Sequence, residues 1–218
     1  MINQLNQNIM RKINFLLFIV LAAFGFTIQA QNVHFGVKGG VNFATLSGDV
    51  QDVNSKTSFH FGGVAEISIS EKFSVQPELL YSSQGAKSEF TETFEGVTVN
   101  ANQKIKLDYI NVPIMAKYYV SDGFSIEAGP QVSFLTSAKL DYDFTYDGST
   151  ESGSEDFKDL TKGIDFGLGF GVGYKMGSGL NFGARYNLGL TNINDDPDDP
   201  ESNIKNNVFQ LSIGYFFL

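Results

Sequence analysis

The chain has no cysteine and no tryptophan among its 218 residues, and it has only two histidines. Without cysteine there can be no disulfide, no thiolate metal site, no cysteine nucleophile and no lipid-anchored N-terminal cysteine. Bases are also scarce, since 15 Lys and Arg stand against 24 Asp and Glu, for a net charge of −9. This balance argues against a nucleic-acid partner, because nucleic-acid binding depends on Lys and Arg contacts to phosphate.

Long apolar runs are rare too, and the only one lies near the N-terminus. Residues 13–26 are apolar except for Asn14, they follow Arg11 and Lys12, and the small residue Ala30 comes shortly afterwards. A basic region, a short apolar core and a small residue before the cut are the three parts of a secretory signal peptide. We predict a cleaved signal peptide over residues 1–30 and an exported domain over residues 31–218, in which any further membrane contact must be made by strands.

The exported part follows the period of β-strands. Apolar and polar residues alternate in eight runs, and no segment has a helical period. The runs cover residues 33–43, 59–69, 73–84, 107–118, 124–134, 164–175, 180–190 and 209–217. Leu107 and Tyr109 are out of phase with Ile110 and Val112 in the fourth run, which predicts a bulge near residues 109–113.

The connections between these runs alternate in length. Three are hairpin turns, at about residues 70–72, 120–123 and 175–179, and they are rich in Gly, Asp and Ser. The other four are long, at about residues 46–57, 86–103, 138–162 and 192–206. In an up-and-down meander all short turns fall at one end and all long loops at the other, which is the plan of an outer-membrane barrel.

A soluble lipocalin-like barrel has the same alternation with its two faces reversed, so the polar face must decide between them. Here that face consists mainly of Gly, Ser, Asn and Gln with a few charges of both signs, whereas a sheet facing water carries more Lys and Glu. Small polar residues suit the narrow lumen of eight strands. We therefore predict an all-β fold, an eight-stranded antiparallel up-and-down transmembrane β-barrel.

Charge is distributed unevenly between the barrel and its loops. The four long loops hold 17 acids and six bases, a net of −11, while the rest of the exported chain holds seven of each sign. The charges on the polar face are predicted to form a structural salt-bridge network in the lumen. Its members are Lys38, Glu66, Glu78, Lys117, Glu127, Asp165 and Arg185.

With these residues laid out, the chain resembles the small outer-membrane β-barrel proteins of Bacteroidetes-type bacteria that are grouped as the PorT family, with an OmpA/OmpX-like architecture. The matching stretches are GVKGGVNFATLSG (36–48), FSVQPELLYSSQGAK (73–87), LDYINVPIMAKYYV (107–120), FSIEAGPQVSFL (124–135) and GFGVGYKMGSGLNFGARYNLGLTNI (169–193). The founding member of the family is implicated in protein secretion. The chain departs from the usual outer-membrane ending, because Leu218 stands where a terminal aromatic residue is typical.

Three chemical alternatives remain beside a purely structural reading. His60 with a nearby serine such as Ser58 resembles in outline the sites of outer-membrane lipid-modifying hydrolases, though no motif accompanies it. The paired acids of the lumen are compatible with general acid–base chemistry. The acidic stretch DDPDDPE is a weak candidate for calcium, because Ca²⁺ takes several carboxylate oxygens. Its acids are Asp195, Asp196, Asp198, Asp199 and Glu201.

The sequence thus favours a protein without catalysis, cofactor or metal. We expect a structural, surface-interaction or secretion-accessory role, with outer-membrane lipid and the barrel-assembly machinery as partners and an unknown surface or secretion partner at the long loops. A lipid-modifying hydrolase, a soluble periplasmic lipocalin-like binding barrel and a narrow pore are the alternatives. The aromatics Tyr142, Phe144 and Tyr146 either extend the adjoining strands above the membrane or form a contact surface.

Overall fold

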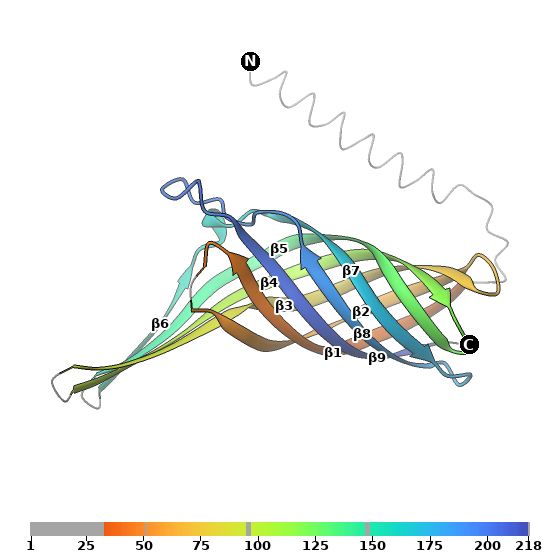
Figure 1. Cartoon of the computed structure of the whole chain (residues 1–218), viewed down its shortest axis with the longest axis horizontal. Coiled ribbons are helices and arrows are strands. Elements are labelled where there is room, and N and C mark those ends of the chain that lie inside the picture. Colours follow the sequence, from red (N-terminus) through yellow and green to blue (C-terminus); the bar gives the residue numbers. More distant parts are fainter. Residues whose placement is uncertain (1–32, 51, 95–96, 147–148, 218) are drawn as a thin grey trace, which may run out of the picture. The chain divides into compact units, whose positions relative to one another are not determined.

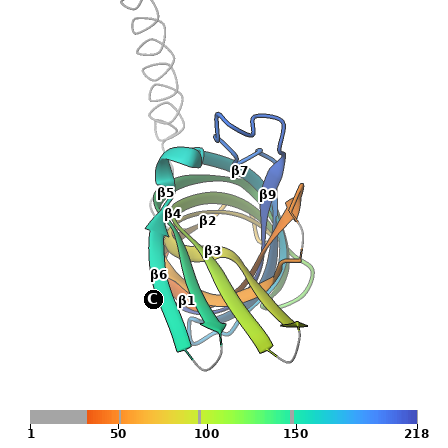
Figure 2. The ribbon, with the colours of Figure 1, turned by 90° about the vertical axis from the view of Figure 1, so that its left-hand side faces the viewer.

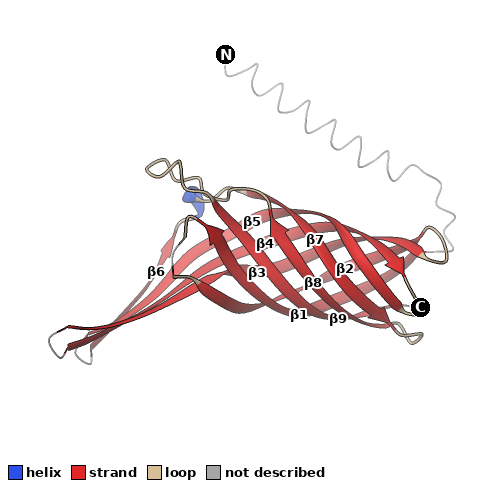
Figure 3. Cartoon of the chain, viewed as in Figure 1, coloured by secondary structure: helices blue, strands red, loops and turns tan. Residues whose placement is uncertain are grey.

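A computed structural model describes residues 33–217 except 51, 95–96 and 147–148, and leaves the side chains of residues 92–99 undescribed (Figure 1). The signal peptide predicted over residues 1–30 lies outside the described residues. The strands are β1 (Val33–Gly48), β2 (Asn54–Ser68), β3 (Phe73–Phe94), β4 (Val97–Tyr119), β5 (Phe124–Tyr146), β6 (Ser149–Asp156), β7 (Ile164–Lys175), β8 (Leu180–Gly189) and β9 (Ile204–Phe216). One short 3₁₀ helix, Lys158–Leu160, precedes β7 (Figure 3).

The strands form a closed antiparallel ring. The sheet order is β4-β3-β2-β1-β9-β8-β7-β5-β6, and an additional pairing of β4 with β5 closes it (Figure 2). Strand β5 has two successive neighbours on one edge, with β7 along its first half and β6 along its second half. Eight strands therefore make the barrel, as the sequence predicted, and β6 is a ninth strand outside the ring. Among the described residues no helix is long and apolar enough to span a membrane.

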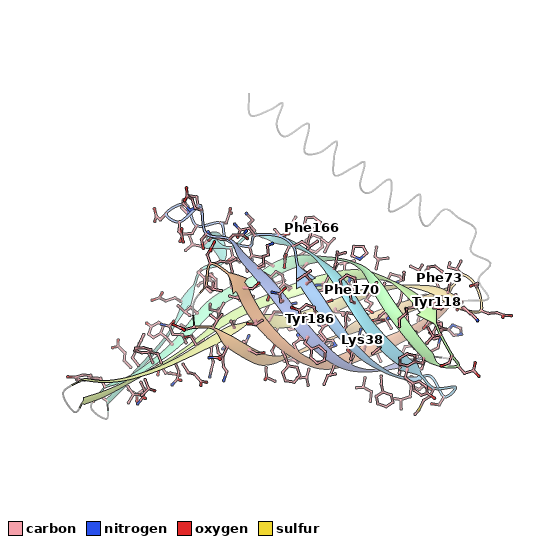
Figure 4. All side chains as sticks on the ribbon, in the orientation of Figure 1. Lys38, Phe73, Tyr118, Phe166, Phe170 and Tyr186 are labelled. Carbon is pink, nitrogen blue, oxygen red and sulfur yellow. The ribbon has the colours of Figure 1, made fainter. Side chains whose placement is uncertain are left out.

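The barrel is apolar outside and polar inside. Large side chains such as Phe35 and Phe166 are 64% and 52% exposed, whereas Asn42, Asn111 and Gln210 in the lumen are at most 1% exposed. Figure 4 shows rings projecting away from the wall on several strands, including the labelled Phe73, Tyr118, Phe166, Phe170 and Tyr186. This is the reverse of a soluble barrel and matches the surface expected in lipid.

Two of the four long connections are mostly strand, and a third, predicted over residues 46–57, is reduced to residues 49–53 between β1 and β2. Strand β3 continues to Phe94 and β4 begins at Val97, so most of the connection predicted over residues 86–103 is a hairpin. Strand β5 continues to Tyr146 and pairs with β6, which replaces much of the loop predicted over residues 138–162. The alternation of Tyr142, Phe144 and Tyr146 is therefore a strand extension, because ladder pairing goes on beyond the membrane.

The predicted bulge has a different position and consequence. The pairing of β4 with β5 shifts between Asp108 and Tyr109, which lie opposite Ser137 and Leu135, so the extra residue is Thr136 of β5. Strand β4 keeps its alternation without a reset, since Leu107, Tyr109 and Asn111 are all buried in the interior. The prediction of a register reset in β4 was wrong, because it assumed that every apolar side chain of the strand faces outward.

The two faces of the sheet instead exchange polarity at one height. On the outer face of β4, Tyr118, Ile114 and Ile110 are followed by Asp108 and then by more polar residues. On the inner face the order is opposite, from charged and polar side chains to apolar ones. Strand β5 does the same, since Phe134 on its outer face gives way to Lys139 and Asp141. We take the level of this inversion, between Ile110 and Asp108, as the membrane boundary on the side of the long connections. With 23 residues, β4 spans about 76 Å at ~3.3 Å per residue, far more than a ~30 Å hydrocarbon core needs.

Candidate functional site

The centre of the lumen is an ionic cluster around Glu78. Arg185 donates from Nη2 and Nη1 to the two carboxylate oxygens of Glu78 at 2.7 and 2.9 Å, and from Nε to Glu127 at 2.7 Å. Lys38 lies 3.3 Å from the same carboxylate, and Gln76 donates to it at 2.6 Å. The bidentate Arg–carboxylate geometry is the strong form of such a pair and fixes both side chains across the lumen.

A second cluster surrounds Glu66, on the side of the hairpin turns. Its carboxylate accepts hydrogen bonds from the Tyr119 hydroxyl at 2.6 Å and from Lys175 at 3.0 Å, and Lys117 lies at 3.5 Å. Lys117 also donates to Oε1 of Gln76, whose amide nitrogen donates to Glu78, so the two clusters are connected. Sequence reasoning missed Lys175, because it was read as the end of a strand, and Gln76, because it carries no charge.

Six of the seven residues predicted for the lumen network are thus brought together, and Asp165 is not. It is 5% exposed and lies in the row in which Asn111 of β4 pairs with Ser133 of β5, which in turn pairs with Asp165 of β7. Its Oδ1 has no hydrogen-bond partner among the described residues, and neither amide atom of Asn111 has one. This row is a separate polar patch on the outer side of the ionic clusters.

His60 takes part in a hydrogen-bonded chain with partners other than the serine the sequence suggested. Its Nδ1 lies 2.7 Å from Oδ1 of Asn42, and its Nε2 lies 3.0 Å from Oγ of Ser212. Since Asn42 Oδ1 can only accept, Nδ1 carries the proton and Nε2 accepts from Ser212. Ser58 instead donates to the backbone oxygen of Ser83.

This serine–histidine–amide order has the connectivity of a hydrolase triad, but its surroundings do not suit catalysis. His60 is 1% exposed and Asn42 is fully buried, so a lipid has no direct path to them through the described wall. Ser212 lies in mid-strand and pairs with Gly40 and Gly183, so the ladders on both sides engage the backbone N–H groups that an oxyanion would need. We interpret the chain as part of the polar filling of the lumen.

Above the polar filling the interior becomes apolar. A cluster of buried side chains from β1, β3, β4, β5 and the last loop covers the outer end of the lumen, and it was not predicted from the sequence. Its members are Leu46, Ala86, Leu107, Tyr109, Leu135, Ala138 and Ile193. A cavity of about 270 Å³ lies against this cluster, next to Leu160 and Ile204. The out-of-phase pair of Leu107 and Tyr109 was the signal that could have revealed this layer.

Beyond this layer, β3, β4, β5 and β6 continue as a four-stranded sheet that protrudes on the side of the long loops (Figure 1). A groove of about 950 Å³ lies on the face of this sheet that is continuous with the lumen. Phe90, Ala101 and Phe144 line it from the sheet, and Asp52 and Val53 line it from the β1–β2 connection. Both of these hollows lie at the outer end of the lumen or beyond it.

The acidic stretch between β8 and β9 forms turns rather than a cage of ligands. The Asp196 carboxylate accepts from the backbone N–H of Asp198, and Asn194 accepts from the backbone N–H of Asp196. Among the described residues no three acidic or histidine side chains are grouped closely enough to hold a metal ion. The proposed calcium ligands Asp195, Asp196, Asp198, Asp199 and Glu201 are thus not assembled in this conformation.

Comparison with known proteins gives one family match and several solved structures of low sequence identity. Residues 29–195 match the family described as the outer membrane protein beta-barrel domain. Ail, the attachment invasion locus protein of Yersinia pestis, is 13% identical with a TM-score of 0.48, over 86% of this chain and 100% of that one. Neisserial surface protein A is 14% identical over 84% and 97%, with a TM-score of 0.46. OprG from Pseudomonas aeruginosa is 15% identical over 87% and 99%, with a TM-score of 0.38. The search of curated proteins gives no match.

Proposed function

Because this chain belongs to the outer membrane protein β-barrel family, we propose that it acts at the cell surface as a closed, non-catalytic barrel that presents its protruding sheet to a partner. The observation that carries the proposal is the contrast between a filled lumen and a large, ordered extension on one side of the membrane. The barrel is the anchor, and the extension of β3, β4, β5 and β6 is the part that interacts.

The filling of the lumen supports the absence of a channel. Arg185, Glu78 and Lys38 come from β8, β3 and β1, so their contacts cross the interior rather than follow the wall. An eight-stranded barrel is only just wide enough for side chains to fill. The apolar cluster over the outer end adds a second layer without charged side chains, which is unfavourable for ions.

The orientation and assembly of the barrel follow from the same plan. The short turns belong on the periplasmic side and the long hairpins outside, as in other barrels of this kind. Export by a cleaved signal peptide over residues 1–30, insertion by the barrel-assembly machinery and contact with outer-membrane lipid are part of the proposal.

Two measurements test this proposal. Because the chain has no native cysteine, single-cysteine variants report position without background. Ser152→Cys, on β6, is expected to react on intact cells with a membrane-impermeant maleimide, and Ser121→Cys, in a hairpin turn, only after the outer membrane is breached. In planar bilayers the purified barrel is expected to show no stable conductance. Labelling in the reverse pattern, or sustained open channels, would contradict the proposal.

The resemblance to the PorT family gives a second role to test, an accessory part in protein secretion. The similar stretches 36–48, 73–87 and 107–120 lie in β1, β3 and β4, which form the wall and the base of the protruding sheet. If the role is secretory, deleting the gene should reduce the set of secreted proteins while leaving cell-surface labelling of other barrels unchanged. An unchanged secreted set would remove this role and leave the surface-interaction role standing.

A further inference from the structure

The protruding sheet has one aromatic face, which continues the lumen face of the barrel and is called here the inner face. Phe90 of β3 pairs with Ala101 of β4, which pairs with Phe144 of β5, so these three side chains lie in one row across the sheet. Tyr142 and Tyr146 flank Phe144 on the same face, and the rings of Tyr142 and Phe144 are 5.5 Å apart between centroids. The inner face is therefore rich in aromatic rings, with the polar side chains of Ser88 and Gln103 beside them, and it faces the β1–β2 connection.

This face is not covered by the described part of the protein. Phe90 is 51% exposed, Phe144 39% and Tyr146 59%. Lipid does not cover it either, because the opposite face of the same strands carries Lys104, Asp141 and other polar groups above the membrane boundary. Exposed apolar patches with a polar rim mark binding sites on soluble surfaces.

The charges beside the inner face are all of one sign. Glu151 of β6 pairs with Phe144 and Glu155 pairs with Leu140, so both carboxylates lie on the inner face. Asp52 lines the same groove from the β1–β2 connection. In the protruding part of β3–β6 the described inner-face positions contain no Lys or Arg, while Lys87, Lys104, Lys106 and Lys139 all lie on the outer face.

The combination of exposed aromatic rings and carboxylates indicates that the ligand of this face is cationic. Rings attract a cation by their quadrupole, and carboxylates attract it by charge. An anionic lipid or polysaccharide would be repelled, and a second copy of this chain, with a net charge of −9, would bring the same acids to the face. Strand β6 pairs with β5 alone in the described part of the sheet, so its free edge offers main-chain hydrogen bonds to an extended chain.

We propose that the inner face of the protruding sheet binds an extended basic peptide segment of a partner protein. The apolar side chains of this segment pack on Phe90 and Phe144, and its Lys or Arg side chains lie beside Glu151 and Glu155. In an extended segment alternate side chains point to opposite sides, so one stretch can present both kinds of group. The inference rests on the proposed surface role and adds the chemical class of the partner to it.

The test is a binding titration with a defined probe, the fluorescein-labelled peptide Lys-Val-Lys-Tyr-Lys-Val-Lys. The full barrel is held in nanodiscs of zwitterionic lipid, fluorescence anisotropy reports binding, and empty nanodiscs give the background. We expect saturable binding that weakens about fivefold in Glu151→Gln/Glu155→Gln, from the loss of two exposed ion pairs. The matched control is Asp143→Asn/Asp156→Asn, which removes the same charge from the outer face and is expected to leave binding within about twofold.

A second pair of variants tests the aromatic part. Phe90→Ser/Phe144→Ser is expected to weaken binding more than tenfold, because two rings no longer shed water in the complex. Its strand content by circular dichroism, compared with the native barrel, shows whether the sheet has kept its fold. If it has not, the inner-face and outer-face acid variants, which alter only exposed carboxylates, remain decisive.

Equal losses in the inner-face and outer-face acid variants would overturn the inference, because diffuse charge attraction would then suffice. Absence of saturable binding would overturn it as well. In either case the cysteine labelling and conductance results stand independently, so failure here is distinguishable from failure of the proposed surface role.

Discussion

Replacing Arg185 tests whether the ionic cluster holds the barrel together. In Arg185→Gln, Glu78 keeps only Lys38 at 3.3 Å and Gln76, and Glu127 loses its partner at 2.7 Å. Breaking a buried ion pair from one side costs about 3–5 kcal/mol, because a charge is left without compensation. With a urea slope of about 2 kcal/mol per M, the unfolding midpoint should fall by about 2 M.

The assay is urea unfolding of the barrel in micelles, followed by the circular dichroism of its strands. Adding Glu127→Gln to Arg185→Gln removes the orphaned carboxylate and should restore about 1–2 kcal/mol, a coupling typical of side chains in contact. Lys87→Gln is the control, because its pair with Glu89 is exposed and contributes less than about 1 kcal/mol. If the midpoint of Arg185→Gln falls by less than about 0.5 M, or if the double variant recovers no stability, the structural role of the cluster is refuted.

Three further outcomes are expected from other parts of the barrel. Leu168→Arg, on the lipid face, should lower the free energy of unfolding by about 2–4 kcal/mol in the same assay. Gly169→Ala should lower it much less, because the added Cβ would approach mainly the end of the Asn187 side chain. Similar losses for the two variants would mean that the faces are misassigned. Burial lowers the pKa of Lys56, at the mouth of the barrel, to about 8, so above that pH the unfolded chain binds more protons than the folded one. The free energy of unfolding should therefore rise from about pH 8 towards pH 10. In a parallel pH series, Lys56→Met should show a smaller rise. A fluorophosphonate probe should leave Ser212 unmodified by mass spectrometry, and its labelling would revive the hydrolase alternative.

The barrel was predictable from the sequence because lipid and lumen impose opposite demands on alternate residues. That contrast is strong in β7, where Phe166 and Phe170 alternate with glycines, and it sufficed to count the eight strands of the barrel wall. The lumen charges could be named for the same reason, since a charged residue on a wall strand has no place in lipid. Which of them meet could not be predicted, because the tilt and stagger of the strands decide whether Arg185 reaches Glu78 or Asp165.

The protruding sheet was anticipated only as one of two readings of Tyr142, Phe144 and Tyr146, because the alternation that predicts the barrel has a different meaning above the membrane. Above the membrane boundary apolar side chains no longer face outward. Leu107 and Tyr109 face the interior there, so in the sequence they are out of phase with the lipid-facing residues of the same strand. The chain there still has the period of a strand, but the meaning of its two faces is exchanged. The triad-like contacts of His60 were hidden for another reason, since Ser212 lies 152 positions away in the sequence.

The exchange of polarity between Asp108 and Ile110 also sets how deep the protein sits in its bilayer. Sinking by two residues along a strand, about 7 Å, would carry Asp108 and its polar neighbours into hydrocarbon, and rising by the same amount would lift Ile110 and Phe134 into water. Both faces thus resist vertical displacement at the same level. The outer-face residues of the strands therefore fix the depth of the barrel in the bilayer, and with it the height of the protruding sheet above the membrane boundary.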